Sequence, residues 1–182
     1  AANNFEKALA AFEKAPPQNP DLLIGYVGYR LALIERYKNH NYDKAISSLD
    51  KAKNLVTKEY QRTSTKTEVI SKTFDNAIAD LSNFELDIYL NVPEKLNEAI
   101  QKFEKAIQAE PNNYIKHVAY ASLLEKSDEK KAIEIYEKAI KIDPTHLTAY
   151  FNLGAMYNNI AAKYSKQAIL VDDYKKSDEL QQ

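Results

Sequence analysis

Residues 96–112, LNEAIQKFEKAIQAEPN, and residues 129–145, EKKAIEIYEKAIKIDPT, carry the same pattern at an offset of 33 residues. In each run a small residue, an aromatic residue and a second small residue follow one another at steps of four and three, and a proline closes the run. This spacing places the three side chains on one helical face, and the proline ends the helix. The corresponding positions are Ala99, Phe103, Ala106 and Pro111, and then Ala132, Tyr136, Ala139 and Pro144.

The amino-acid composition favours one fold class and excludes several classes of function. Only three glycines and six prolines occur in 182 residues, which favours an all-helical chain with short connections. The 25 basic and 26 acidic side chains give a net charge of −1, so no overall field attracts nucleic acid or anionic lipid. Cysteine is absent, which excludes disulfides and thiolate sites. No apolar run approaches the roughly 20 residues of a membrane helix, so we expect no membrane insertion.

The small–large–small spacing recurs before residue 96, at Ala8, Phe12 and Ala15 and again at Ala45, Leu49 and Ala52. We therefore expect residues 1–182 to form one helical solenoid segment. Its first helix lacks a hairpin partner in the sequence, which suggests trimming at that end. The predicted parts are a second helix of a hairpin at 3–16, a repeat at about 21–56, a long helix at about 65–90, repeats at about 93–110 and 112–142, and a long terminal helix at about 145–180.

Gly25 and Gly28 lie three residues apart inside the predicted helix that begins at about residue 21. A glycine in a helix interior costs about 1 kcal/mol relative to alanine, so two of them indicate close backbone packing. We expect the face carrying Ala8 and Ala11 to be the neighbour. A phosphate-binding loop is disfavoured, because GYVG lacks the strand–turn–helix context.

The small–aromatic–small–Pro spacing resembles the second helix of a tetratricopeptide (TPR) repeat, and YFNLGAMY at 150–157 resembles the first helix, through Tyr150, Leu153, Gly154 and Tyr157. The resemblance implies an all-α, right-handed solenoid of antiparallel helix hairpins with two elongated helices. In it, small residues such as Gly154 let paired helices approach closely. The long helix after residue 145 is similar to that of exported bacterial TPR proteins, which favours an exported or periplasmic location over a cytoplasmic one.

The resemblance implies a non-catalytic adaptor or scaffold that binds another protein or a peptide on a concave face built from first helices. The lysine and asparagine of the carboxylate clamp of chaperone-binding relatives are replaced here by Val118 and Ser122, or by Phe151 and Ala155, so that clamp is not expected. Asn152 stands where relatives hold a ligand backbone; the alternative is a polar surface residue. Transferred positions are Ile115, Val118, Ala119, Ser122, Glu125, Thr148, Phe151, Asn152, Ala155 and Asn159.

No pattern of chemistry-bearing residues suggests an enzyme. The three histidines lack partners at metal-ligand spacing apart from a weak Asp143/His146 coincidence, and no P-loop, nucleophile elbow or dinucleotide turn occurs. We therefore expect neither catalysis nor a cofactor nor a metal. Thirteen tyrosines are present. Those at repeat packing positions are expected to pack, although tyrosine also suits binding surfaces: Tyr26, Tyr29, Tyr120, Tyr136, Tyr150 and Tyr157.

Two alternatives to the adaptor remain open. The long helices at 65–90 and 145–180 could mediate self-assembly, with a homodimer through the terminal helix. The chain could also be the interaction segment of a larger enzyme or secretion complex.

Overall fold

The computed structural model describes residues 2–14, 23–64 and 66–179, with side chains in the terminal helix described to residue 170. All regular structure in these ranges is helical, without a strand, which confirms the all-α prediction of stacked helix hairpins. The predicted boundaries at residues 16, 21, 65 and 180 lie outside the described residues. The chain divides into two compact units, unit 1 (Ala1–Lys95) and unit 2 (Leu96–Gln182).

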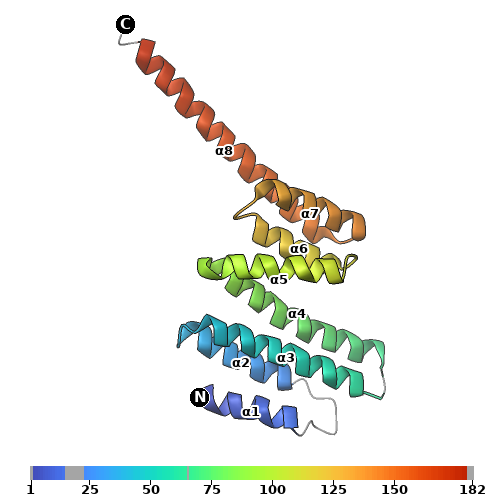
Figure 1. Ribbon diagram of the computed structural model, residues 1–182. Helices are drawn as coiled ribbons and strands as arrows, with labels where there is room; N and C mark the ends of the chain where they lie inside the picture. Colours follow the sequence, from blue (N-terminus) through green and yellow to red (C-terminus); the bar gives the residue numbers. More distant parts are fainter. Residues whose placement is uncertain (1, 15–22, 65, 180–182) are drawn as a thin grey trace. The chain divides into compact units, whose positions relative to one another are not determined.

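Unit 1 is built around an antiparallel hairpin of two helices, with one helix packed on either side of it (Figure 1). Its core is formed by aliphatic side chains such as Ile24, Leu31, Leu49 and Ile88, none of which is more than 2 % exposed. The elements are α1 (Ala2–Lys14), α2 (Leu23–Tyr37), α3 (Tyr42–Arg62), α4 (Glu68–Asn91) and a 3₁₀ turn, η1 (Pro93–Lys95).

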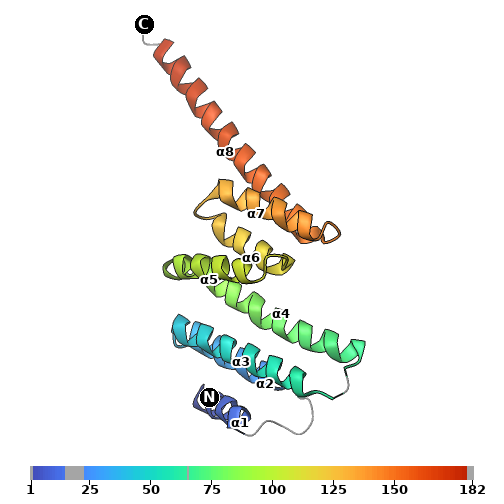
Figure 2. The ribbon, with the colours of Figure 1, turned by 45° about the vertical axis from the view of Figure 1, so that its right-hand side comes forward.

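Unit 2 contains a second hairpin, with α8 running far beyond the end of α7 (Figures 1 and 2). The code of residues 129–145 lies at its centre, because Ala132, Tyr136 and Ala139 are all fully buried. Ala149 and Met156 of the last helix pack into the same core. The elements are α5 (Leu96–Ala109), α6 (Tyr114–Leu124), α7 (Glu129–Ile142) and α8 (Leu147–Glu179).

Gly25 and Gly28 lie at a close helix contact, but their neighbour is α3 and not α1. A Cβ added at Gly28 would collide with the Cβ of Ala52, and a Cβ at Gly25 would lie 3.4 Å from Val56. The prediction that Ala8 and Ala11 form the opposing face is therefore wrong. The glycines face their own hairpin partner because the short α2–α3 turn holds these two helices closest together.

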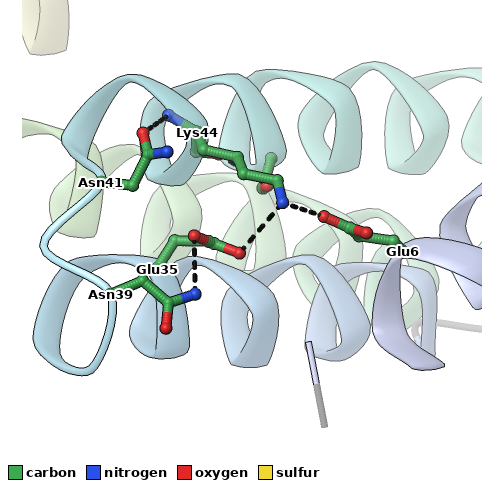
Figure 3. Close-up of polar contacts among 6 residues, drawn as sticks. Glu6, Glu35, Asn39, Asn41 and Lys44 are labelled. Atoms are coloured by element: carbon green, nitrogen blue, oxygen red, sulfur yellow. Dashed lines mark hydrogen bonds and ion pairs between the residues drawn. The ribbon is translucent and has the colours of Figure 1, made fainter. Parts of the chain in front are cut away.

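The turn between α2 and α3 is fixed by a buried carboxylate (Figure 3). Glu35 is 1 % exposed, and its carboxylate accepts a hydrogen bond from the Asn39 amide at 2.9 Å. Lys44 lies 3.3 Å from the same carboxylate and also pairs with Glu6, so it connects α1 to the hairpin. The side chain of Asn41 accepts from the Lys44 backbone N–H at 3.0 Å and caps α3.

The beginning of α8 is capped from another helix. The phenol oxygen of Tyr114 in α6 accepts a hydrogen bond from the backbone N–H of Ala149 at 2.8 Å. The same hydroxyl donates to the carbonyl of His146 at 3.2 Å, and the two rings lie 4.5 Å apart. One side chain of α6 therefore satisfies a free backbone donor in the first turn of α8.

Gly154 does not mark a close helix contact. A Cβ built on it would meet no atom within 4 Å, so the expected role in helix pairing is not present in the described part of the chain. The reason is the phase of α8: Ala149 and Met156 face α6 and α7, whereas Gly154 lies on the opposite side of the helix.

Candidate functional site

The surfaces best suited to binding lie on α2 and α4 in unit 1 and on α6 and α8 in unit 2. In unit 1 an open cleft of about 690 Å³ lies between α2 and α4. This volume falls within the range of about 300–1,000 Å³ that is usual for ligand sites. Its walls combine aromatic rings with polar groups, from Gly25, Tyr26, Tyr29, Ala77, Asp80, Leu81, Asn83 and Phe84.

The three rings of the cleft range from the exposed Tyr26 to the buried Phe84, and contacts between rings order them. Tyr29 and Phe84 pack at 5.1 Å between centroids, and Tyr26 is 56 % exposed. The Arg30 guanidinium lies 6.0 Å from the Tyr26 ring. Asp80 is the one charged residue among the lining side chains that the structure describes. The cleft therefore offers aromatic surface together with a single negative charge.

Two ion pairs between neighbouring helices hold the walls of this cleft. Arg36 of α2 pairs with Asp87 of α4, and its guanidinium also lies 5.4 Å from the Phe84 ring. Lys53 of α3 pairs with Glu85, which is 2 % exposed. Because both acidic partners belong to α4, these contacts fix the rotation of α4 against the hairpin. Asp80 is thereby kept on the open side.

The residues transferred from the family to unit 2 fall into three groups by exposure. Ile115 and Phe151 are 66 % and 76 % exposed, and Ala119 is buried with 8 % exposure. Ala119 is therefore part of the packing and offers no contact surface in this conformation. Thr148, Ala155 and Asn159 are exposed, whereas Val118, Ser122, Glu125 and Asn152 are half-buried.

Three of these half-buried residues converge on the hydroxyl of Tyr136. Ser122 lies 2.8 Å from this oxygen, the Asn152 amide donates to it at 3.4 Å, and the hydroxyl donates to the Glu125 carboxylate. Burial raises the pKa of the Tyr136 hydroxyl, and the hydrogen bond to Glu125 raises that pKa further. The hydroxyl therefore stays protonated and links α6, α7 and α8. Asn152 is positioned by this network, with hydrogen-bonding capacity remaining on its amide.

The six tyrosines expected at packing positions divide in the same way. Tyr120 and Tyr136 are buried at 1 % and 0 % exposure, and Tyr29 is half-buried against Phe84, as predicted. Tyr26, Tyr150 and Tyr157 are instead between 44 % and 56 % exposed, so the prediction that they pack is wrong for these three. The physical reason is that each lies on the side of its helix that faces away from its hairpin's core.

The described residues offer little for chemistry. They contain no group of three or more histidine, cysteine or acidic side chains that could hold a metal. His117 is fully buried, and its Nδ1 lies 2.9 Å from the Asn113 carbonyl, so it serves the packing of α6. In the same part of the chain no helix combines the length and apolar character needed to cross a bilayer.

Sequence reasoning did not find the cleft of unit 1. The irregular spacing of 54 residues between Ala45 and Ala99 obscures the register of α4, so no family position could be transferred to Asp80 or Asn83. A usable signal exists, because Asn76, Asp80 and Asn83 recur at steps of four and three and mark one polar row on an amphipathic helix.

Comparison with known proteins agrees with the geometry of unit 2. The family model of the TPR repeat matches residues 122–159, which run from the end of α6 through α7 into α8. No protein of curated function matches the sequence. The matched stretch contains both the buried Ala132–Tyr136–Ala139 code and the 150–157 segment that resembles a first helix. Residues 122–159 are thus similar to a TPR repeat, and the described chain consists of all-α helix hairpins.

Proposed function

We propose that this chain is a non-catalytic adaptor that holds a peptide or an extended partner segment on the first-helix face of unit 2. TPR repeats generally mediate protein–protein interactions, which supports a scaffold role. The first-helix face is defined here by Ile115, Thr148, Phe151, Asn152 and Asn159. Val118, Ser122 and Ala155 complete the proposed contact surface.

The observation that carries this proposal is the exposure of two large apolar side chains beside a polar network. Ile115 and Phe151 project from successive first helices and are 66 % and 76 % exposed. Large exposed apolar groups that a polar rim surrounds are typical of binding surfaces. Asn152 lies next to Phe151, and its amide can both donate to and accept from a peptide backbone. Apolar anchors and a backbone-reading amide together suit an extended peptide.

The test is a pull-down from native extract with the immobilised chain, beside two variants of α8. Phe151→Glu/Asn152→Ala changes the first-helix face, and Tyr157→Glu places the same charge on another side of the helix. We expect a partner that the natural chain and the second variant retain and the first variant loses. If only the second variant loses the partner, or if all three proteins retain it equally, the partner does not bind to the first-helix face. An empty pull-down by the natural chain would count against the adaptor.

The cleft of unit 1 favours a second contact, with a basic side chain of a bound segment. A cation can lie over the rings of Tyr26 and Tyr29 while it pairs with Asp80, and both interactions strengthen as water is excluded. Asp80→Lys should then weaken binding of a captured partner about tenfold or more, whereas Asp75→Lys, an exposed control on α4, should not. Titration of the purified partner by calorimetry measures this difference, and equal affinities would remove the cleft from the binding site.

A further inference from the structure

The face of α8 beside its packed side carries a regular stripe of alternating large and small residues. Tyr150, Tyr157 and Tyr164 recur every seven residues, and a small residue follows each tyrosine four positions later. All six members are exposed, the tyrosines at 44 %, 48 % and 66 %. We call this set the tyrosine stripe: Tyr150, Gly154, Tyr157, Ala161, Tyr164 and Ala168.

The stripe has the spacing of a helix–helix seam. Steps of four and three residues give an average period of 3.5, the repeat that keeps one face of a helix against a partner helix in a left-handed coiled coil. Nothing in the described part of the chain covers this face, and Gly154 has no atom within 4 Å of its Cβ position. A glycine there costs about 1 kcal/mol of helix stability with no packing contact inside the chain to offset it.

We propose that the tyrosine stripe binds the tyrosine stripe of a second copy of this chain in an antiparallel pair. With a two-fold axis at the level of Asn159, Tyr150 lies opposite Ala168 of the second copy. The same operation places Gly154 opposite Tyr164 and Tyr157 opposite Ala161. Every layer of the seam then combines one ring with one small residue, which is the condition for even packing.

The parallel arrangement lacks this complementarity. It would place Tyr157 on Tyr157 and Gly154 on Gly154, so crowded layers would alternate with empty ones, and both kinds are unfavourable. The stripe is therefore complementary to itself in one direction only. This directional match is what identifies a second copy as the occupant.

The charges of α8 permit the pair. Between residues 150 and 168 the charged side chains are Lys163 and Lys166, and neither belongs to the stripe or stands directly beside it in the seam. Lys163 lies 3.3 Å from Glu129 of α7 and is directed to the packed side of the helix. Two copies can therefore approach without like charges facing each other across the seam, where such charges would repel.

The seam covers 19 residues, about 28 Å of helix. This is a short interface, at the small end of those that form specific complexes. We therefore expect a reversible dimer that is populated at roughly 100 µM protein and dissociates at about 1 µM. The proposal does not depend on the adaptor function, because it uses another side of α8.

Two adjacent alanines provide a matched test by sedimentation velocity over that concentration range. Ala161→Glu places a charge in the stripe, and Ala162→Glu places the same charge on an exposed position just outside it. We expect the natural chain and Ala162→Glu to dimerise and Ala161→Glu to remain monomeric, with equal helix content by circular dichroism. If all three are monomeric at the highest concentration, or if all three dimerise alike, the proposal is wrong. If all three are monomeric, the stripe would instead be a candidate site for a helix of a different protein.

The direction of the pair is tested separately, since the natural chain contains no cysteine. A mixture of Tyr157→Cys and Ala161→Cys should form mostly the mixed disulfide under mild oxidation. Each variant alone should cross-link several-fold less. Preferential cross-linking of Tyr157→Cys with itself would indicate a parallel pair and overturn the antiparallel register.

Discussion

Two helical glycines, one in each unit, have opposite surroundings. Gly28 in α2 is buried, and any side chain there would collide with Ala52 of α3. Gly154 in α8 is exposed and faces open space. Glycine therefore occurs at a close helix contact in unit 1, at Gly28, and on an open helix face in unit 2, at Gly154. What separates them is the side of the helix on which each lies, which depends on where the partner helix is placed.

The largest expected effect comes from filling the close contact. Gly28→Ala should lower the free energy of unfolding by about 3 kcal/mol, because the added methyl forces α2 and α3 apart despite the better helix propensity of alanine. Urea denaturation followed by circular dichroism measures the loss. A change smaller than about 1 kcal/mol would mean that the hairpin relaxes easily, and the comparison with Gly154 would lose its basis.

The packed side of α8 should be the next most sensitive place. Tyr136→Phe removes the hydroxyl that joins Ser122, Glu125 and Asn152, and we expect a loss of about 1.5 kcal/mol in the same denaturation experiment. Tyr164→Phe removes an exposed hydroxyl for which the structure shows no partner and serves as the control. Equal effects of the two changes would show that the network does not hold α8.

The open side of α8 should respond in the reverse direction. Gly154→Ala is expected to stabilise the chain by about 0.5–1 kcal/mol, because alanine is the better helix former and its methyl meets no atom of the chain. Paired with Gly28→Ala in one experiment, it gives opposite signs for the same substitution. A loss of stability at Gly154 would mean that a contact exists there under the conditions measured.

The smallest effect is expected from alkaline pH. The folded chain holds the pKa of Tyr136 above its ordinary value of 10.0, so the folded state keeps this proton where the unfolded state releases it. The associated stability is present below pH 10.0 and is lost as the pH rises above that value. The free energy of unfolding should therefore fall more steeply above this pH for the natural chain than for Tyr136→Phe. Parallel curves would contradict this role of the hydroxyl.

The sequence allows the helices and the chemistry of their faces to be predicted, but not which faces meet. Helical periodicity and caps are local, so the code around Tyr136 and the capping residues Asn41 and Asp128 are readable from neighbouring letters. The partner of Gly28 and the open surroundings of Gly154 depend on contacts between distant segments. The predictions failed at both positions for this reason.

The candidate site residues also divide into those that local sequence patterns predict and those that depend on contacts between distant segments. Positions in α6 and α8 could be transferred one by one through the repeated spacing. Five of the ten are exposed, four are half-buried and Ala119 is buried. The cleft with Tyr26 and Asp80 arises where two helices far apart in the sequence come together. No periodicity within α2 or within α4 contains that information.

The hydroxyl of Tyr114 couples the unfolding of α6 to that of α8. The Ala149 amide is held by a side chain of α6, so its exchange with solvent deuterium reports the integrity of α6 as well as that of α8. In a repeat protein such a bond adds to the nearest-neighbour coupling that makes hairpins open together rather than one at a time. Tyr114→Phe should speed deuterium uptake at Ala149 selectively and loosen the coupling between the two helices.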